Sequence, residues 1–486
     1  MLRYEASIAY NFGQQLGDET TRTDRWPTTL NVGSLVLSDL LALTTAASIG
    51  YFYWAHGVLH QRLSDYLPLL PLLALFPAIY ATAGLYPGFG LGAVETLRRL
   101  VHCTNASFIA VVVCIFVFKA DARYSRMTLG VAWLAALVSV PLLRFLTLSI
   151  VKQLRWSGEP VIIFGRLQDV ARVIRALRHA FALGYKVAGV VSCDQPTAIS
   201  VVEDIPVLGG MEVLGHLRHF AVRTVLLWDG VEQPGVLDTL HRHFRNVVLI
   251  REGDTLPIEH IRLRNLGGVL GIEFKGGLLG RRNAVIKRVI DVIFGTLMLI
   301  VALPIIALFA ATVQMMSRGS IFFFQEREGL HGTHFRVWKL RTMCPDAEQK
   351  LAECLANDSE LNRQWNRNVK LLHDPRIVPL VGNFMRRFSI DELPQLWNII
   401  NGTMSLVGPR PFPEYHLSRF RADFRQLRTA VRPGLTGMWQ VMVRSDGGLK
   451  EQERYDTYYI RNWSLWLDIY LLARTIFVVL TSSGAR

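Results

Sequence analysis

Five long apolar segments constrain this chain more than any other feature, because about 20 apolar residues are what a helix needs to cross a bilayer. The first four lie at 32–57, 66–86, 102–119 and 128–150. They predict a transmembrane region of four helices over 31–152, after a polar segment at 1–30. Asp39 and Arg144 interrupt the apolar pattern, so we expect them to face the interior of the bundle or to lie near an interface.

Basic residues beside these segments predict which side of the membrane each end faces, since cytoplasmic loops are enriched in lysine and arginine. The residues that favour a cytoplasmic N-terminus are Arg22, Arg25, Arg98, Arg99, Lys152 and Arg155. Arg123 and Arg126 lie in an opposite loop and weaken the argument. The first 30 residues have no apolar core of a cleavable signal, so insertion is expected to rely on the later segments.

Composition excludes some functions. Hydrophobic residues make up 51% of the chain and charged residues 19%, with a formal net charge of +14. Such a cationic balance suits anionic lipids or phosphorylated substrates, and no basic run with interleaved aromatics favours nucleic acid. None of the five cysteines forms a C-x-x-C pair, which argues against a zinc site and a disulfide framework.

Residues 158–275 have a different pattern. A buried-type strand at 160–165 is followed by a helical stretch at 168–181, and strand-like runs follow at 185–192, 224–228 and 246–250. This alternation predicts a parallel, Rossmann-like α/β domain. Gly165 is followed by Arg166 and Leu167, so the glycine fingerprint of dinucleotide binding is missing. We interpret the domain as degenerate, with a role in regulation or in self-association into a homodimer.

The fifth apolar segment, Val289 to Met316, has a proline near its middle. A straight helix of this length would reach about 42 Å, whereas each arm on either side of Pro304 would reach only about 20 Å. Basic residues flank both ends, and both ends then prefer the cytoplasmic face. We therefore predict a re-entrant helix hairpin broken at Pro304; the alternative is a kinked transmembrane helix. At its mouth, Arg288 and Asp291 share a helical face and are expected to pair.

Two adjacent carboxylates, Asp391 and Glu392, precede Pro394 in the sequence FSIDELPQLWN. Proline is tolerated in the first turn of a helix, which places the helix start near Asp391. Free backbone N–H groups and the helix dipole would hold a carboxylate there in its ionised form. A nucleophilic carboxylate beside an anion site suggests phosphoryl chemistry. The alternative is an N-cap aspartate with a surface glutamate.

Several cations are candidates to bind phosphate around these carboxylates. Alternation over 335–343 puts Lys339 and Arg341 on one face of a strand, although an exposed polar face would read the same. Arg410 stands between two prolines, Pro409 and Pro411, which stiffen the backbone and fix the direction of its guanidinium. A rigid loop with an exposed arginine is the alternative. The other two candidates directly precede the carboxylate segment: Arg386 and Arg387.

These segments resemble, in order, those of the bacterial polyprenyl-phosphate hexose-1-phosphate transferases. The segments are Lys339–Met343, Asp374–Arg376, Ser389–Asn398, Met404–Pro411 and Arg432–Gln440. The resemblance covers 281–486, and the preceding regions resemble the long members that act on galactose or glucose. Residues 355–358 and the region of Trp365 lean towards the galactose branch. Val443-Arg444-Ser445 departs from the Ser-Gly-Arg of many members.

The resemblance implies a two-step, magnesium-dependent reaction on the cytoplasmic face of the bacterial inner membrane. Asp391 would attack the β-phosphate of a UDP-sugar, release UMP and carry the phosphosugar until undecaprenyl phosphate takes it. Glu392, with Asp391, would bind the metal. Lys339, Arg386 and Arg410 would hold phosphates. The product would begin the synthesis of a surface polysaccharide, such as O-antigen, capsule or exopolysaccharide.

The predicted fold is therefore a multi-pass membrane protein with three parts. A helical transmembrane bundle is followed by a soluble, degenerate Rossmann-like domain at 158–275. A mainly α-helical, monotopic catalytic domain at 281–486 carries the re-entrant helix at 289–316. Two other functions stay open at this point: a membrane glycosyltransferase that releases UDP, and a non-enzymatic membrane scaffold.

Overall fold

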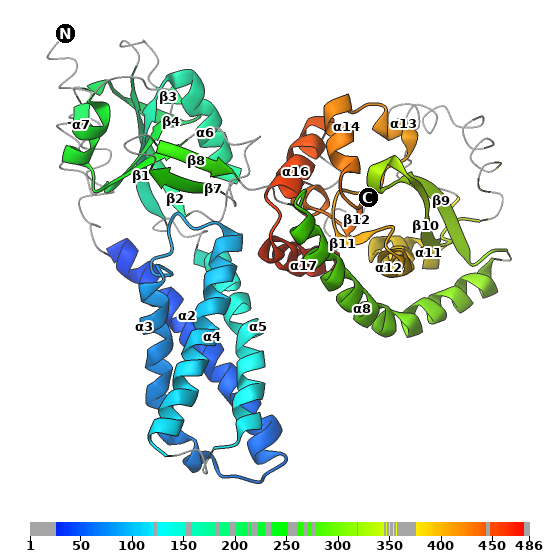
Figure 1. Ribbon diagram of the computed structural model, residues 1–486, viewed down its shortest axis with the longest axis horizontal. Coiled ribbons are helices and arrows are strands. Elements are labelled where there is room, and N and C mark those ends of the chain that lie inside the picture. Colours follow the sequence, from blue (N-terminus) through cyan, green and yellow to red (C-terminus); the bar gives the residue numbers. More distant parts are fainter. Residues whose placement is uncertain are drawn as a thin grey trace. The chain divides into compact units, whose positions relative to one another are not determined.

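The computed structural model describes most of the chain as two compact units, Met1–Glu252 and Gly253–Arg486 (Figure 1). The described residues are 26–119, 124–151, 158–179, 184–193, 201–211, 213–214, 222–228, 235–250, 261–265, 270–274, 278–317, 319–344, 347, 349, 353, 356, 376–443 and 448–480. Several predictions lie outside them. These concern 1–25, Arg123, Lys152, Arg155, Leu355, Asn357, Asp358, Trp365, Asp374, Pro375, Arg444 and Ser445.

The first unit begins with a bundle of apolar helices. Its elements are α2 (Trp26–Gly50), η1 (Tyr51–His56), η2 (Leu63–Asp65), η3 (Leu67–Ala74), α3 (Leu75–Thr82), α4 (Ala93–Val117) and α5 (Arg126–Val151). Small and aromatic side chains form the bundle's core, among them Ala42, Phe76, Tyr80 and Ala136. Most of the remaining apolar surface faces outward, as expected of helices in lipid.

Three helical segments of this bundle are long and apolar enough to cross a membrane: Thr29–His56, Ala93–Val117 and Arg126–Val151. The second predicted segment differs, since its helix covers only Leu67–Thr82 and its first half is a 3₁₀ helix that contains Pro71. A 3₁₀ helix rises about 2.0 Å per residue, against about 1.5 Å for an α-helix. The 16 residues therefore reach about 28 Å, nearly the thickness of a hydrocarbon core.

Asp39 and Arg144 form a buried ion pair inside the bundle, the first of their two expected positions. The Arg144 guanidinium lies 2.5 Å from the Asp39 carboxylate, and it also donates to the carbonyl of Leu85. Tyr86 donates a second hydrogen bond to Asp39. Both charges are thus shielded from lipid by each other and by neighbouring polar groups.

The rest of the first unit contains a six-stranded sheet with the order β3-β4-β2-β1-β5-β6. The strands are β1 (Glu159–Gly165), β2 (Tyr185–Ser192), β3 (Val201–Val202), β4 (Ile205–Gly209), β5 (Thr224–Trp228) and β6 (Asn246–Ile250). All neighbours are parallel except β3 and β4. Residues of β1 alternate between two apolar clusters, so both faces of the sheet are covered. The helices of this part are α6 (Leu167–His179) and α7 (Val236–His243).

The second unit opens with an antiparallel strand pair and a long helix. The elements in order are β7 (Ile261–Asn265), β8 (Leu270–Phe274), α8 (Arg281–Met316), β9 (Phe322–Glu328), η6 (Leu330–Gly332), β10 (His334–Leu340), α11 (Val381–Arg387), η7 (Ile390–Glu392), α12 (Gln395–Asn401), β11 (Ser405–Val407), α13 (Glu414–Leu417), α14 (Ala422–Thr429), β12 (Gly434–Thr436), α15 (Met438–Met442), α16 (Leu449–Arg461) and α17 (Leu465–Leu480). Strands β9 and β10 form a hairpin, and β11 pairs with β12 in parallel.

Helix α8 is continuous through Pro304, so the predicted break into two helices is not present. Figure 1 shows instead one helix that curves along its length. In its first half, Arg288 donates to the carbonyls of Ile399 and Ile400 at the end of α12. In its second half, Phe309 stacks on Phe384 of α11, with ring centroids 5.9 Å apart. Both halves of this apolar helix therefore contact the same unit.

Candidate active site

The backbone around Asp391 turns sharply before α12. Ser389 has a left-handed conformation, with φ of 55°, and the single 3₁₀ turn η7 then carries both carboxylates. Pro394 precedes the first residue of α12, and Gly402 ends the helix with φ of 92°. The predicted helix start and its glycine cap are thus present. The carboxylates lie one short turn before the α-helix itself.

Glu392 is held between two cations. One of its oxygens, Oε1, accepts hydrogen bonds from Lys339 Nζ at 2.7 Å and from Arg410 Nη2 at 2.9 Å. Burial alone would raise the pKa of Glu392, but Arg410 and Lys339 outweigh it and lower the pKa to about 2. Glu392 is therefore a permanent anion that fixes the positions of two phosphate-binding candidates.

Asp391 has the opposite environment. Burial and the neighbouring charge of Glu392 raise its pKa to about 6, although Lys339 and Arg386 oppose the shift. A backbone hydrogen bond also lowers the pKa, but desolvation is the larger effect. With a pKa near 6, most of the group is still ionised at neutral pH, and it binds protons more readily than an exposed aspartate.

The other predicted cations have different surroundings. Arg386 acts electrostatically on Asp391 and donates from Nε to the hydroxyl of Thr342 at 2.9 Å. Arg387 is exposed, and its guanidinium lies 5.7 Å from the ring of Phe388. Arg341 is buried and donates to the carbonyl of Ser317, just past the end of α8. The described contacts therefore bring Lys339, Arg386 and Arg410 to the carboxylates.

The loop that carries Arg410 is fixed by its neighbours. Gly408 lies against Gly434. A Cβ added at Gly434 would come within 2.1 Å of the Gly408 backbone nitrogen. Gly434 also donates to the carbonyl of Pro409, which is buried, and Pro411 follows Arg410 as a partly buried residue. Two loops thus meet in backbone-to-backbone contact, and the direction of Arg410 follows from that contact.

Arg428, on α14, is a residue that no sequence pattern identifies. Its guanidinium donates to the carbonyl of Arg410, lies 4.9 Å from the Phe412 ring centre and 3.3 Å from Asp456. Burial raises the pKa of Asp456 to about 6, against the opposing effect of Arg428. No motif surrounds Arg428, and only the fold brings it beneath the Pro409–Pro411 loop.

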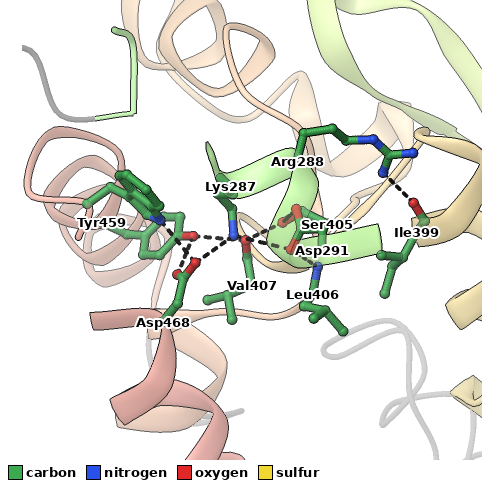
Figure 2. Close-up of polar contacts among 10 residues, drawn as sticks. Lys287, Arg288, Asp291, Ile399, Ser405, Leu406, Val407, Tyr459 and Asp468 are labelled. Carbon is green, nitrogen blue, oxygen red and sulfur yellow. Dashed lines mark hydrogen bonds and ion pairs between the residues drawn. The ribbon is translucent and has the colours of Figure 1, made fainter. Parts of the chain in front are cut away.

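A buried ionic network joins α8 to β11, the strand that precedes this loop (Figure 2). Lys287 Nζ lies 2.7 Å from Asp468 and 3.6 Å from Asp291. Asp291 accepts a hydrogen bond from the Ser405 hydroxyl at 2.7 Å and another from the Leu406 amide at 3.1 Å. The predicted pairing of Arg288 with Asp291 is replaced by this arrangement, in which Asp291 holds the start of β11 to the membrane helix.

The same network fixes the far end of β11. Tyr459 donates to the Val407 carbonyl at 2.9 Å and is 2.8 Å from Asp468 (Figure 2). Trp463 donates to the other oxygen of Asp468 at 3.0 Å. Residues from α8, α16 and α17 therefore hold the strand that leads directly into Gly408.

Asp391 and Glu392 fit one mode of magnesium binding. Among the described residues, no group of three or more acidic, histidine or cysteine side chains surrounds a common point. Mg²⁺ is, however, often held by one or two carboxylates together with substrate phosphates and water. The two carboxylates therefore suit a metal that arrives with a phosphorylated substrate.

Arg327, on β9, is a second residue that no motif identifies. In the sequence it is one of the basic residues that follow the apolar helix. Its cross-strand partner is Phe335, and Phe323 on the same strand is opposite Lys339. Since opposite residues share a face, Arg327 and Lys339 project from the same face of the hairpin. Pairing β9 with β10 from their alternating sequence patterns would have placed Arg327 on the face of Lys339.

The chain is similar to proteins of known name. The family model "Bacterial sugar transferase" matches residues 282–482, and the model "CoA-binding domain" matches residues 83–227. The undecaprenyl-phosphate galactose phosphotransferase of Salmonella typhimurium is 31% identical over 75% of this chain and 77% of its own length. The UDP-glucose:undecaprenyl-phosphate glucose-1-phosphate transferase of Escherichia coli is 29% identical over 66% and 68%, respectively. The exopolysaccharide production protein ExoY of Sinorhizobium fredii is 40% identical over 201 residues, 41% of this chain and 87% of that protein.

Proposed function

Since the chain belongs to the bacterial polyprenyl-phosphate sugar-1-phosphate transferases, we propose that it transfers hexose-1-phosphate from a UDP-sugar to undecaprenyl phosphate and releases UMP. The names of its relatives favour UDP-galactose as the donor, with UDP-glucose second. The observation that carries the proposal is the contrast between the two adjacent carboxylates. One is buried with a raised pKa, and the other is locked between two phosphate-binding cations.

In the first step, the ionised carboxylate of Asp391 attacks the β-phosphorus of the UDP-sugar. A bond forms between Oδ and phosphorus, while the bond from phosphorus to the bridging oxygen breaks. UMP leaves with that electron pair, and Asp391 carries the phosphosugar. Splitting one displacement into two suits a carboxylate that is ionised at neutral pH and already desolvated.

In the second step, an oxygen of undecaprenyl phosphate attacks the same phosphorus and the Asp391 oxygen leaves. The product is a polyprenyl diphosphate sugar, and the carboxylate is regenerated. Lys339, Arg386 and Arg410 would stabilise the phosphate oxygens in both steps, with Glu392 keeping Lys339 and Arg410 in place. Arg341, Arg387, Pro409 and Pro411 were predicted to help bind substrate. For the two prolines, that role is to aim Arg410.

Magnesium is the proposed cofactor, and Glu392 with Asp391 would hold it. It would neutralise charge on the diphosphate during both displacements. The chain's own part is to supply the two carboxylates and to keep Glu392 ionised at all physiological pH values. The remaining ligands would come from the substrate phosphates and water.

The site is proposed to lie at the cytoplasmic face of the bacterial inner membrane, where a soluble nucleotide can meet a lipid phosphate. Helix α8 supports a re-entrant position, because both of its halves contact the same unit while most of its apolar surface is exposed. A helix that crossed the bilayer would carry its two ends to opposite sides. Its mean hydropathy is too high for a helix surrounded by water.

The parallel sheet of the first unit is proposed to be a degenerate Rossmann-like domain. The first turn of this domain lies between β1 and α6 and contains Gly165 and Arg166. It lacks the glycines that let a pyrophosphate approach the backbone. Its proposed role is regulation or self-association into a homodimer. The mass of the detergent-solubilised chain, with and without residues 158–275, tests the second role.

A nucleotide-release assay tests the reaction. Full-length protein in membranes is incubated with magnesium, UDP-galactose and undecaprenyl phosphate, and the released nucleotide is separated from the donor. UMP is the expected product. Release of UDP would instead identify a glycosyltransferase that moves the sugar without its phosphate. Repeating the assay with several UDP-sugars and analysing the lipid product identifies the hexose.

A further inference from the structure

Arg327 projects from the face of the β9–β10 hairpin that meets the carboxylates. Lys339, on the same face, bonds to Glu392, so this face lies against the site. The adjacent residue, Glu328, lies on the other face of the hairpin and pairs with Arg425 at 2.9 Å. The hairpin thus presents one cation at each end of its site-facing surface, and only the Lys339 end has a carboxylate partner.

The guanidinium of Arg327 has one donor without a partner among the described residues. Nη2 donates to Gln325 on the same strand at 2.5 Å. Nη1 is buried and has no hydrogen-bond partner in the part of the chain that the structure describes. A buried donor without an acceptor is costly, so it needs an explanation, and an anion bound during the reaction is one. By contrast, Lys339 and Arg410 already share Glu392.

Arg327 is farther along the hairpin from the nucleophile than Lys339 is. Lys339 is opposite Phe323, four residues along β9 from Arg327. The charged and polar groups that act on the Arg327 guanidinium are Tyr415, Arg410 and Glu392. Those that act most strongly on Asp391 are Glu392, Lys339 and Arg386. Lys339 thus acts on the attacking carboxylate directly, whereas Arg327 shares only Glu392 with it.

The geometry of in-line displacement gives Arg327, at this distance from Asp391, a role with the leaving group. Attacking and leaving oxygens lie on opposite sides of the transferred phosphorus. If Asp391 approaches the β-phosphorus from one side, the bridging oxygen and the α-phosphate leave on the other, towards Arg327. Charge develops on that leaving phosphate as the bond breaks, and a guanidinium is well suited to hold it.

We propose that Arg327 binds the α-phosphate of the UDP-sugar and stabilises the UMP that leaves in the first step. The proposal rests on the proposed function, and it adds a leaving-group residue to a site in which the other cations surround the transferred phosphate. The electron pair of the broken bond stays on the bridging oxygen, which becomes an oxygen of UMP beside Arg327.

Binding of UMP and uridine separates a phosphate contact from a structural effect. The full-length Asp391→Asn chain, which cannot turn over, is titrated with each ligand, and Arg327→Gln is then added. We expect the substitution to weaken UMP at least tenfold and to leave uridine within twofold, because only UMP carries the phosphate. In a folded variant, an equal change for both ligands, or no change for UMP, would overturn the proposal.

Arg336→Gln is the matched control, since Arg336 is on the same hairpin, 73% exposed, and contacts only Glu326 at 4.0 Å among its ion pairs. It should leave the UMP-to-uridine affinity ratio unchanged. Should Arg327→Gln lose uridine as well through misfolding, Arg327→Lys decides. The lysine variant keeps the positive charge but not the forked N–H donors of the guanidinium. Its UMP-to-uridine affinity ratio should therefore fall, but by less than in a folded Arg327→Gln variant. A ratio equal to that of the parent would refute the contact.

Turnover gives a second readout in the Asp391-containing enzyme. Arg327→Gln should slow the first UMP release by about 10²-fold or more, as removal of one transition-state donor does elsewhere. Wild-type enzyme that released UDP would contradict the proposed function. Wild-type release of UMP with an unchanged rate in Arg327→Gln would contradict the role of Arg327 alone.

Discussion

Asp391 and Glu392 are neighbours in sequence, yet their environments push their pKa values apart. Lys339 and Arg410 converge on Glu392, whereas Asp391 receives burial and the charge of Glu392 itself. Such divergence separates a group that stays charged from a group that reacts. The proposed division of work, in which Asp391 attacks and Glu392 organises cations, follows from this contrast.

The pH dependence of the first step should report the pKa of Asp391. Only the ionised carboxylate attacks, so the rate of phosphosugar formation is expected to be constant above pH 7. It should fall about tenfold per pH unit well below pH 6. The measurement uses radiolabelled donor without acceptor lipid, because the acceptor phosphate also titrates near pH 6.

Asp456 provides the control for this profile, since its pKa is also raised to about 6. Asp456→Asn would loosen Arg428 and lower the rate at every pH, but the midpoint should stay near 6. A midpoint that moved with this substitution would assign the titration to Asp456 and not to Asp391.

Removing the nucleophile should remove the covalent label. Asp391→Asn is expected to lower turnover by at least about 10³-fold and to trap no phosphosugar, because an amide is a poor nucleophile. Glu392→Gln should still fold, yet it releases Lys339 and Arg410 from their shared anion and should also be strongly impaired. Gel analysis of protein incubated with radiolabelled donor gives the result. Label on residue 391's peptide is required in the wild-type chain, and turnover without it would contradict the mechanism.

At the scale of elements, the attachment of α8 depends on one lysine between two acids. Lys287→Met leaves Asp291 and Asp468 buried without their cation, and loss of one partner from a buried charge cluster costs about 3–5 kcal/mol. We expect a clearly lower melting temperature in detergent. Arg282→Met, on the same helix but exposed, should change it little. Equal melting temperatures for both variants would show that the network contributes no net stability.

Cysteine labelling tests the position of α8 in the membrane. Asn283→Cys lies in the first turn of α8 and Ser320→Cys lies just after its end, and a re-entrant helix keeps both on the cytoplasmic side. A membrane-impermeant maleimide should therefore label neither in intact cells and both in inverted vesicles. His60→Cys, after the first apolar helix, is expected to label from outside and serves as the positive control. Labelling of Ser320→Cys in intact cells would mean that α8 crosses the bilayer.

Local patterns predicted the elements well where one interaction dominates. The strands at 185–192, 224–228 and 246–250 have the predicted bounds, because continuous apolar runs in a covered sheet leave little choice. The α8 helix is less predictable: a proline removes one hydrogen bond, but the surrounding helix can curve without breaking. Likewise, Pro71 and its neighbours give a 3₁₀ helix where hydropathy alone indicated an ordinary span.

The candidate site was predictable only in part. Motifs placed the carboxylates, Lys339 and the Pro409–Pro411 loop at one site, and described contacts join Glu392 to Lys339 and Arg410. Arg428 could not be selected in this way, since its position depends on the packing of distant elements, and Arg327 requires the pairing of β9 with β10. The raised pKa of Asp391 could not be predicted either, because burial depends on the whole unit and a helix terminus does not reveal it.

At the scale of the whole molecule, the second unit is proposed to hold all the chemistry. The match to the exopolysaccharide production protein ExoY covers 87% of that protein but only 41% of this chain. We therefore expect residues 278–486, expressed alone in membranes, to release UMP from the preferred UDP-sugar. The full chain measured at equal protein amount is the comparison. A folded fragment without activity would show that the first unit contributes to the site.

A bent apolar helix whose two arms rest on one unit has the shape of a wedge. In the proposed position, the helix adds volume to the leaflet nearest the site and none to the opposite leaflet. The unequal volume curves the bilayer. The free energy of insertion is therefore most favourable where the leaflet nearest the site is already convex or loosely packed. The lipid composition of the membrane would then control where this protein gathers, independently of any substrate.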